Sequence, residues 1–131
     1  MNPFLVRRRM FMTKEENIIL IKSDALEQGT LNANNGQNFP SDYRVRTKDF
    51  MTLEKGIYEI TCEGAIQGNL VEYDANGTWK KTWFVAHTLL PWSMNFTENC
   101  KIRIALSNGT EAEKILIKPS DVEYIKIRKI T

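Results

Sequence analysis

Apolar and polar residues alternate with a period of two along most of the chain from residue 17 onward. This alternation is typical of β-strands that bury one face, and β-branched and aromatic residues are frequent in the alternating runs. Glycine, asparagine, aspartate and proline separate the runs, as expected for turns. After residue 17, no stretch of ten or more residues shows convincing helical periodicity. The strands predicted in this way cover residues 18–22, 43–48, 56–63, 69–74, 78–86, 100–107, 114–118 and 123–129.

About eight strands without a helix favour an all-β fold, an antiparallel two-sheet jelly-roll sandwich. The first 16 residues differ, because apolar residues flank an arginine triplet and the alternation is missing. We therefore expect one β-sandwich domain over residues 17–131 and an N-terminal docking arm over residues 1–16. Its apolar side chains favour contact with a partner, and a terminal strand or helix closing the domain's own core is the alternative. The docking residues expected in the arm are Phe4, Leu5, Arg7, Arg8, Arg9, Met10 and Phe11.

Residues 74–77, with the sequence DANG, predict the turn of a β-hairpin. Aspartate at the first position and glycine at the fourth fit a type I turn followed by a left-handed residue. In that register Asp74 opposes Thr78 and Tyr73 pairs with Trp79. The pairs expected further along the hairpin are Glu72 with Lys80, Val71 with Lys81, and Asn69 with Trp83.

Alternation divides this hairpin into an inward face and a solvated face. Burying a large ring is worth roughly 2–3 kcal/mol, more than a typical surface contact. Trp79 and Trp83 are therefore expected in the core, with a surface stacking platform as the alternative. The inward face would hold Val71, Tyr73, Trp79, Trp83 and Val85, and the solvated face Leu70, Glu72, Lys80, Thr82 and Phe84.

Two other places in the sequence are candidates for ligand binding. Trp92 follows Pro91 in residues 88–96, a predicted connection, and loops on a rigid sandwich commonly carry recognition. Trp92 is thus a candidate ligand contact, with an anchoring role for this loop as the alternative. Arg44 and Arg46 share one face of a predicted strand and could grip acidic or hydroxyl-rich groups, although a solvated sheet face would look the same.

Composition and charge exclude several classes of protein. The chain has 131 residues, enough for one domain, and its net charge of +2 does not indicate a nucleic-acid partner. No apolar run reaches the roughly 18–20 residues that span a bilayer, and the arginine triplet interrupts any signal peptide, so neither a membrane nor an export address is expected. Cys62 and Cys100 lack metal-site spacing and fall in phase with apolar strand positions, which favours buried thiols over a disulfide.

The sequence offers no catalytic constellation. His87 is the single histidine, and nucleophile-elbow, phosphate-loop and zinc motifs do not occur. Strand carboxylates such as Glu59 and Glu63 could hide a glycosidase pair, but their spacing singles out no two of them. We therefore expect a protein that is not an enzyme and that needs no cofactor or metal.

Five ordered motifs resemble a domain that recurs in bacteriophage tail and other virion structural proteins. They are "SDYRVRTKDF", "LEKGIYEITCEG", "NLVEYDANGTWKKTW", "CKIRIALSNGTE" and "IKPSDVEYIKI", and together they cover about residues 41–127. Such domains resemble jelly-roll carbohydrate-binding modules. The opening "NPFLVRRRMFM" is similar to an N-terminal leader of gut-phage virion proteins.

The resemblance implies a virion accessory protein in the tail, a fibre or the capsid, anchored to other virion proteins by its arm. It also implies that the sandwich binds host-surface glycans, with Arg44, Arg46, Tyr73 and Trp83 as the residues transferred. A homo-oligomer such as a trimer is compatible with this role. The first alternative is a purely structural capsid or tail decoration protein without a ligand, and the second is a small glycan-active enzyme.

Overall fold

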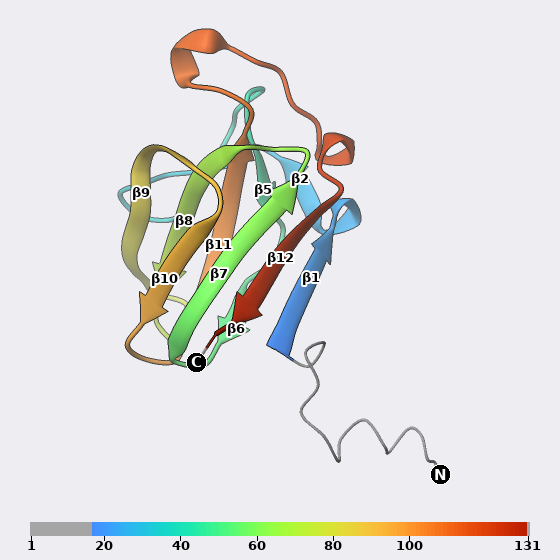
Figure 1. Cartoon of the computed structure of the whole chain (residues 1–131). Helices are drawn as coiled ribbons and strands as arrows, with labels where there is room; N and C mark the ends of the chain where they lie inside the picture. The colour runs from blue at the N-terminus through green and yellow to red at the C-terminus, as the bar shows by residue number, and fades with distance from the viewer. Residues whose placement is uncertain (1–16, 131) are drawn as a thin grey trace.

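A computed structural model describes residues 17–130, and these form an all-β sandwich of two antiparallel sheets (Figure 1). The first sheet lies in front in Figure 1 and has the strand order β1-β12-β7-β10. Every pair in it is antiparallel. The bounds are β1 (Ile18–Lys22), β12 (Tyr124–Lys129), β7 (Gly56–Glu63) and β10 (Trp92–Phe96).

The second sheet lies behind the first and has the strand order β2-β5-β11-β8-β9, with β6 also paired to β11. Residues 29–39 carry a separate two-stranded hairpin, and three short 3-10 helices complete the described chain. The bounds are β2 (Leu26–Gln28), β3 (Thr30–Leu31), β4 (Asn38–Phe39), β5 (Val45–Thr47), β6 (Met51–Leu53), β8 (Gln67–Tyr73), β9 (Trp79–Leu89), β11 (Cys100–Ser107), η3 (Ser23–Ala25), η4 (Glu111–Glu113) and η5 (Pro119–Asp121).

The main core lies between the two sheets and confirms the predicted jelly-roll sandwich. Inward side chains alternate along β7, β10 and β12, because successive residues of a strand point to opposite faces. Each buried aliphatic or aromatic side chain contributes roughly 1.5–3 kcal/mol. The core includes Val45, Ile60, Leu70, Trp92, Met94, Phe96, Ile102, Ile104, Leu106, Ile125 and Ile127.

A loop covers the outer face of the second sheet. This covering loop, residues 29–39, carries β3 and β4, and its Leu31 packs with Val71, Tyr73 and Ala105 in a second, smaller core. β8 and β11 are therefore buried on both faces, and their residues are buried almost without alternation. The sequence predicted only turns in this stretch.

Two predicted elements are wrong. Residues 114–118 are not a strand: Lys114 adopts a left-handed backbone conformation, with φ of 52°, which no strand can continue. Ile117 is buried, whereas Leu116 is 71% exposed. Residues 92–96, predicted as a connection, form β10, so Pro91 ends one strand just before another begins.

The turn of the β8–β9 hairpin is confirmed. The N–H of Gly77 donates to the carbonyl of Asp74 at 2.9 Å, and Gly77 has a φ of +89°. The N–H of Asp74 donates to the carbonyl of Thr78 at 2.8 Å, and Tyr73 pairs with Trp79. The predicted pairing beyond Tyr73 is wrong, because a register irregularity follows it: the observed pairs are Glu72 with Lys81, Val71 with Thr82, and Leu70 with Trp83.

The predicted faces of this hairpin are also wrong in part. Leu70, expected in solvent, belongs to the main core, whereas Val71 and Tyr73 face outward under the covering loop. Both faces of β8 are covered, so alternation could not tell inside from outside. Trp83 packs against the main core as predicted, but Trp79 lies on the outer face and is 37% exposed.

Several predictions fall outside the part of the chain that the structure describes. These are the docking arm over residues 1–16 with Phe4, Leu5, Arg7, Arg8, Arg9, Met10 and Phe11, residue 131, and the side chains of Phe84, Val85 and His87.

Candidate functional site

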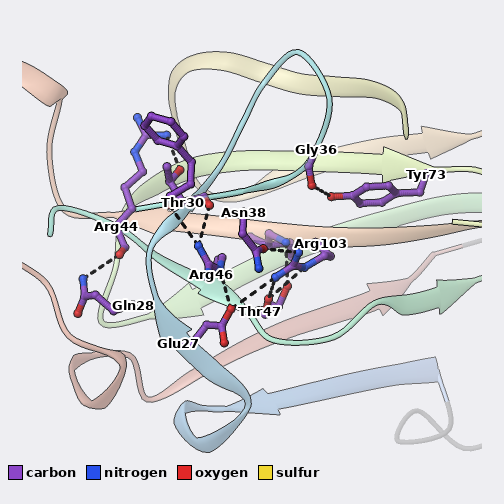
Figure 2. A network of polar contacts seen from close by, with 12 residues as sticks. Glu27, Gln28, Thr30, Gly36, Asn38, Arg44, Arg46, Thr47, Tyr73 and Arg103 are labelled. Carbon is purple, nitrogen blue, oxygen red and sulfur yellow. Dashed lines mark hydrogen bonds and ion pairs between the residues drawn. The ribbon is translucent and has the colours of Figure 1, made fainter. Parts of the chain in front are cut away.

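Arg46 holds the covering loop against the sheet. Its Nε lies 2.6 Å from Oε2 of Glu27, and its Nη1 donates to the carbonyls of Thr30 at 3.1 Å and Phe39 at 3.2 Å (Figure 2). The side chain is only 12% exposed. The structure therefore assigns Arg46 to the chain's own loop rather than to a ligand or a solvated face.

Arg44 and Arg103 complete a clamp of three arginines. Arg44 is buried, and Nη1 lies 3.5 Å from the hydroxyl of Thr30. Burial lowers the pKa of Arg44, against the raising influence of Glu111. Arg103, which the sequence did not single out, donates twice to the carbonyl of Thr47, at 3.1 and 2.6 Å, and once to Oδ1 of Asn38 at 2.8 Å (Figure 2).

This clamp corrects the prediction for Arg44 and Arg46. Residues 29–39 lie across the strand face that was expected to meet solvent or ligand. Backbone carbonyls of such a loop need donors once they are covered, and arginine provides several from one side chain.

The side chain of Trp92 is too deeply buried to bind a ligand. Its side chain is 2% exposed in the main core, and its indole Nε1–H donates to the carbonyl of Thr88 at 3.3 Å. Residues 92–96 alternate between buried and exposed, so the first residue of β10 points inward. The structure thus corrects the ligand-contact interpretation and supports an anchoring one.

The indole ring of Trp83 is partly buried by neighbouring side chains. The indole Nε1–H donates to Oε1 of Glu72 at 2.9 Å, and Nζ of Lys81 lies 4.0 Å from the ring centroid. The ring of Phe96 packs on it with 5.7 Å between centroids. Its role in the described structure is therefore to close one side of the core.

Exposed aromatic side chains do gather at another place, on the outer face beside the β8–β9 turn. Phe50 is 44% exposed and Trp79 37% exposed; the buried Tyr73 packs against the ring of Phe50 and is the cross-strand partner of Trp79. The rings of Phe50 and Tyr73 meet edge to face, 4.7 Å apart, and Nζ of Lys101 lies 5.4 Å from the Phe50 centroid. We call Phe50, Tyr73, Trp79 and Lys101 the aromatic surface.

The covering loop fixes the position of these rings. The hydroxyl of Tyr73 donates to the carbonyl of Gly36 (Figure 2), and burial raises the pKa of Tyr73 so that this proton is retained, although Arg103 acts to lower it. A Cβ at Gly36 would lie 2.7 Å from the Tyr73 ring and 2.9 Å from Cδ1 of Trp79. Because real Cβ atoms do not approach so closely, the contact requires glycine here.

Hydrogen bonds hold Trp79 and the adjacent turn. The indole Nε1–H of Trp79 donates to the hydroxyl of Thr82 at 3.2 Å, which in turn donates to the carbonyl of Ala33 at 2.7 Å. Oδ1 of Asp74 accepts the N–H groups of Asn76 at 2.8 Å and Thr78 at 3.0 Å. The aromatic surface is therefore built on a rigid frame, with amide and carboxylate groups of the turn beside it.

Ring faces next to amide, carboxylate and ammonium groups suit a ligand with both C–H faces and hydroxyl groups. Sugar rings have this character: C–H groups cover an aromatic face while the hydroxyls exchange hydrogen bonds with polar side chains. Tyr73 and Trp79 lie in a segment that the sequence marked as aromatic. Phe50 was missed, because a single phenylalanine before a short strand gives no local signal.

A groove lies at the end of the sandwich where β7 ends and β9 meets β10. Its volume is about 730 Å³. Cys62 lines it, donates through Sγ to the carbonyl of Ala65 at 2.9 Å, and has a pKa raised to about 11 by burial. The residues that line the groove include no aromatic side chain: they are Thr61, Cys62, Glu63, Gly64, Ala65, Ile66, Leu89, Leu90, Pro91 and Asn108.

Both cysteines are free thiols, as the sequence predicted. Burial raises the pKa of Cys100 to about 11 as well. Within residues 17–130, no cluster of three or more histidine, cysteine or acidic side chains could hold a metal ion. None of the helices described there is long and apolar enough to cross a membrane.

Comparison with known proteins finds a similar solved structure. No protein family and no curated protein matches the chain. The similar structure is the C-terminal CBM6 of LamC, a marine laminarinase from Zobellia galactanivorans. It shares 12% sequence identity with a TM-score of 0.38, over 86% of this chain and 100% of that one. Similarity at this level leaves the function to be argued from the residues themselves.

Proposed function

We propose that the sandwich is a non-catalytic carbohydrate-binding module and that its ligand lies on the aromatic surface. The observation that carries this proposal is the pair of exposed rings, Phe50 and Trp79, beside buried Tyr73: Phe50 packs on the Tyr73 ring, and Trp79 is the cross-strand partner of Tyr73. Exposed rings beside polar turn groups are costly to leave in water and favour a ligand that covers them. The groove at the other end offers apolar walls without a ring to stack on.

The expected affinity is weak. Two stacked rings at roughly 1–1.5 kcal/mol each, with two or three hydrogen bonds at roughly 1 kcal/mol each, give about 4–6 kcal/mol in total. That free energy corresponds to a Kd between about 40 μM and about 1 mM for a single site. Useful attachment at this affinity requires several copies on one particle, because linked sites raise the effective concentration.

The finer part of the proposal is that this module belongs to a bacteriophage virion. Its support is the order of the five sequence motifs and the arginine-rich arm over residues 1–16, which resemble virion proteins. In this role the arm docks onto tail, fibre or capsid proteins, the protein forms an oligomer such as a trimer, and the sandwich meets host-surface glycans.

A purely structural decoration protein is the second candidate. The observation that favours it is that the arginines first expected to bind a ligand serve the covering loop instead. In that case the aromatic surface would pack on a neighbouring virion protein.

A glycan array of bacterial wall and capsular polysaccharides tests the proposed binding. The native chain should bind a subset of glycans, and the Phe50→Ala/Trp79→Ala double variant should lose at least about tenfold, because each lost stacking contact weakens binding by roughly 1 kcal/mol or more. Phe39→Ala is the matched control, since Phe39 is also exposed but lies on β4. No binding to any glycan by the native chain would refute carbohydrate binding and leave the decoration role.

The virion role needs its own experiment. Deleting residues 1–16 should abolish incorporation into phage particles while the circular dichroism spectrum stays that of a β protein. Unchanged incorporation of the shortened chain would refute anchoring by the arm.

A further inference from the structure

A small notch opens beside Phe50. Its volume is about 80 Å³, which is larger than the roughly 30 Å³ that one water occupies in the liquid and far too small for a sugar ring. Phe50 belongs both to this notch and to the aromatic surface. A substituent of a sugar stacked on Phe50 is thus the kind of group that the notch could receive. The lining residues are Ile21, Ala25, Thr47, Asp49, Phe50 and Met51.

The walls of the notch are mostly apolar. Ile21, Ala25 and Met51 contribute aliphatic groups, and the hydroxyl of Thr47 already accepts the N–H of Ile104 at 3.1 Å. The other polar group is the carboxylate of Asp49, which is exposed. Within residues 17–130 no hydrogen bond or ion pair engages that carboxylate.

We infer that the notch receives the acetamido group of a 2-acetamido sugar whose ring stacks on Phe50. The methyl group meets the aliphatic walls, and the amide N–H donates to the carboxylate of Asp49, an acceptor that has capacity to spare. A sugar with a hydroxyl at the same carbon would leave the apolar walls uncovered. This inference rests on the carbohydrate-binding function proposed above.

Two matched oligosaccharides separate the acetamido group from the rest of the sugar. Chitotetraose carries an acetamido group at every C2 position, whereas cellotetraose carries a hydroxyl there and is otherwise the same chain. Calorimetric titration of the full-length protein should give at least about tenfold tighter binding of chitotetraose, because a buried methyl and a charge-assisted hydrogen bond favour it. Equal affinities, or tighter binding of cellotetraose, would overturn the inference and leave carbohydrate binding intact. Failure of both sugars to bind would overturn the inference, and the glycan array decides the proposed function separately.

Filling the notch provides the second measurement. Ala25→Leu places a larger side chain into the notch from an exposed position on η3, so the fold should tolerate it. The preference for chitotetraose should fall to about twofold or less while the affinity for cellotetraose stays the same. Ala112→Leu is the matched control, because Ala112 is the exposed alanine of another three-residue 3-10 helix, η4. A preference that survives Ala25→Leu would place the acetamido group elsewhere.

Discussion

Arg103 is the side chain whose loss should damage the described structure most clearly. It is buried, and its guanidinium makes three hydrogen bonds that join β11 to the carbonyl of Thr47 and to Asn38 of the covering loop. Replacement by methionine keeps the aliphatic stem and removes all of these donors. The Thr47 carbonyl then lacks the two guanidinium hydrogen bonds that it accepts in a buried setting.

The expected loss can be worked out from these contacts. Leaving a buried carbonyl unsatisfied costs about 1–3 kcal/mol, and a hydrogen bond from a charged donor to Asn38 adds about 1.5 kcal/mol. We therefore expect Arg103→Met to lower the free energy of unfolding by about 3 kcal/mol, a large share of the roughly 5–15 kcal/mol of a typical domain. For a chain of this size, that corresponds to a fall in Tm of about 9–15 °C.

Urea unfolding followed by tryptophan fluorescence measures this change. Arg128→Met is the control, because Arg128 also makes an ion pair, 2.9 Å from Glu59, but is 48% exposed. An exposed pair contributes about 0–1 kcal/mol, so the control should unfold close to the native chain. Equal loss in the two variants would refute the role of the clamp.

Two further predictions follow from the covering loop and the thiols. Gly36→Ala should destabilise the chain by about 2 kcal/mol and weaken glycan binding. Gly36 has a φ of +72°, and the Cβ of an alanine at this position would collide with the Tyr73 ring. Thermal denaturation of this variant checks the prediction, and an unchanged Tm would contradict it. The second concerns pH: burial raises the pKa of Cys62 and Cys100 from 9.0 to about 11. The unfolded chain therefore loses these protons first, so the thiols contribute stability that is present below pH 9 and lost as the pH rises to about 11. The Cys62→Ala/Cys100→Ala variant should lose less stability between pH 8 and pH 10.5 than the native chain does, as measured by urea unfolding, and parallel losses would refute this.

The strands that the sequence predicted well are those with a long alternating run between clear turn residues. The bounds predicted for β7 and β11, residues 56–63 and 100–107, are those of the structure. The β8–β9 turn was predicted equally well, because aspartate and glycine at fixed positions have a local conformational reason. For these elements, the alternation and the turn residues within each segment are sufficient to predict the structure.

The covering loop could not be predicted, because its stabilising contacts are distant in sequence. Arg103 and Asn38 are 65 residues apart, and Tyr73 and Gly36 are 37 apart. Once this loop buries the outer face of β8, alternation no longer separates the two faces. The assignment of Tyr73 and Trp79 to the main core was wrong for this reason.

The sequence predicted only part of the candidate site, because the site also depends on contacts between residues that are distant in sequence. Tyr73 and Trp79 flank a recognisable turn, but Phe50 joins them only through the pairing of β6 with β11 and of β11 with β8. Trp92 was misplaced because Pro91 was taken to break the strand pattern, whereas β10 begins directly after it. Contacts between strands, rather than residue type, decide which rings reach the surface.

The most direct test of the account is to observe the three indole N–H signals of the protein while a glycan selected from the array is added. A ¹⁵N–¹H spectrum distinguishes Trp79, which is on the aromatic surface, from Trp83 and Trp92, which close or fill the core. The account predicts that the Trp79 signal shifts with a saturable dependence on glycan concentration, and that the Trp92 signal stays in place. A stationary Trp79 signal, with shifts confined to the groove around Cys62 and Leu89, would contradict it.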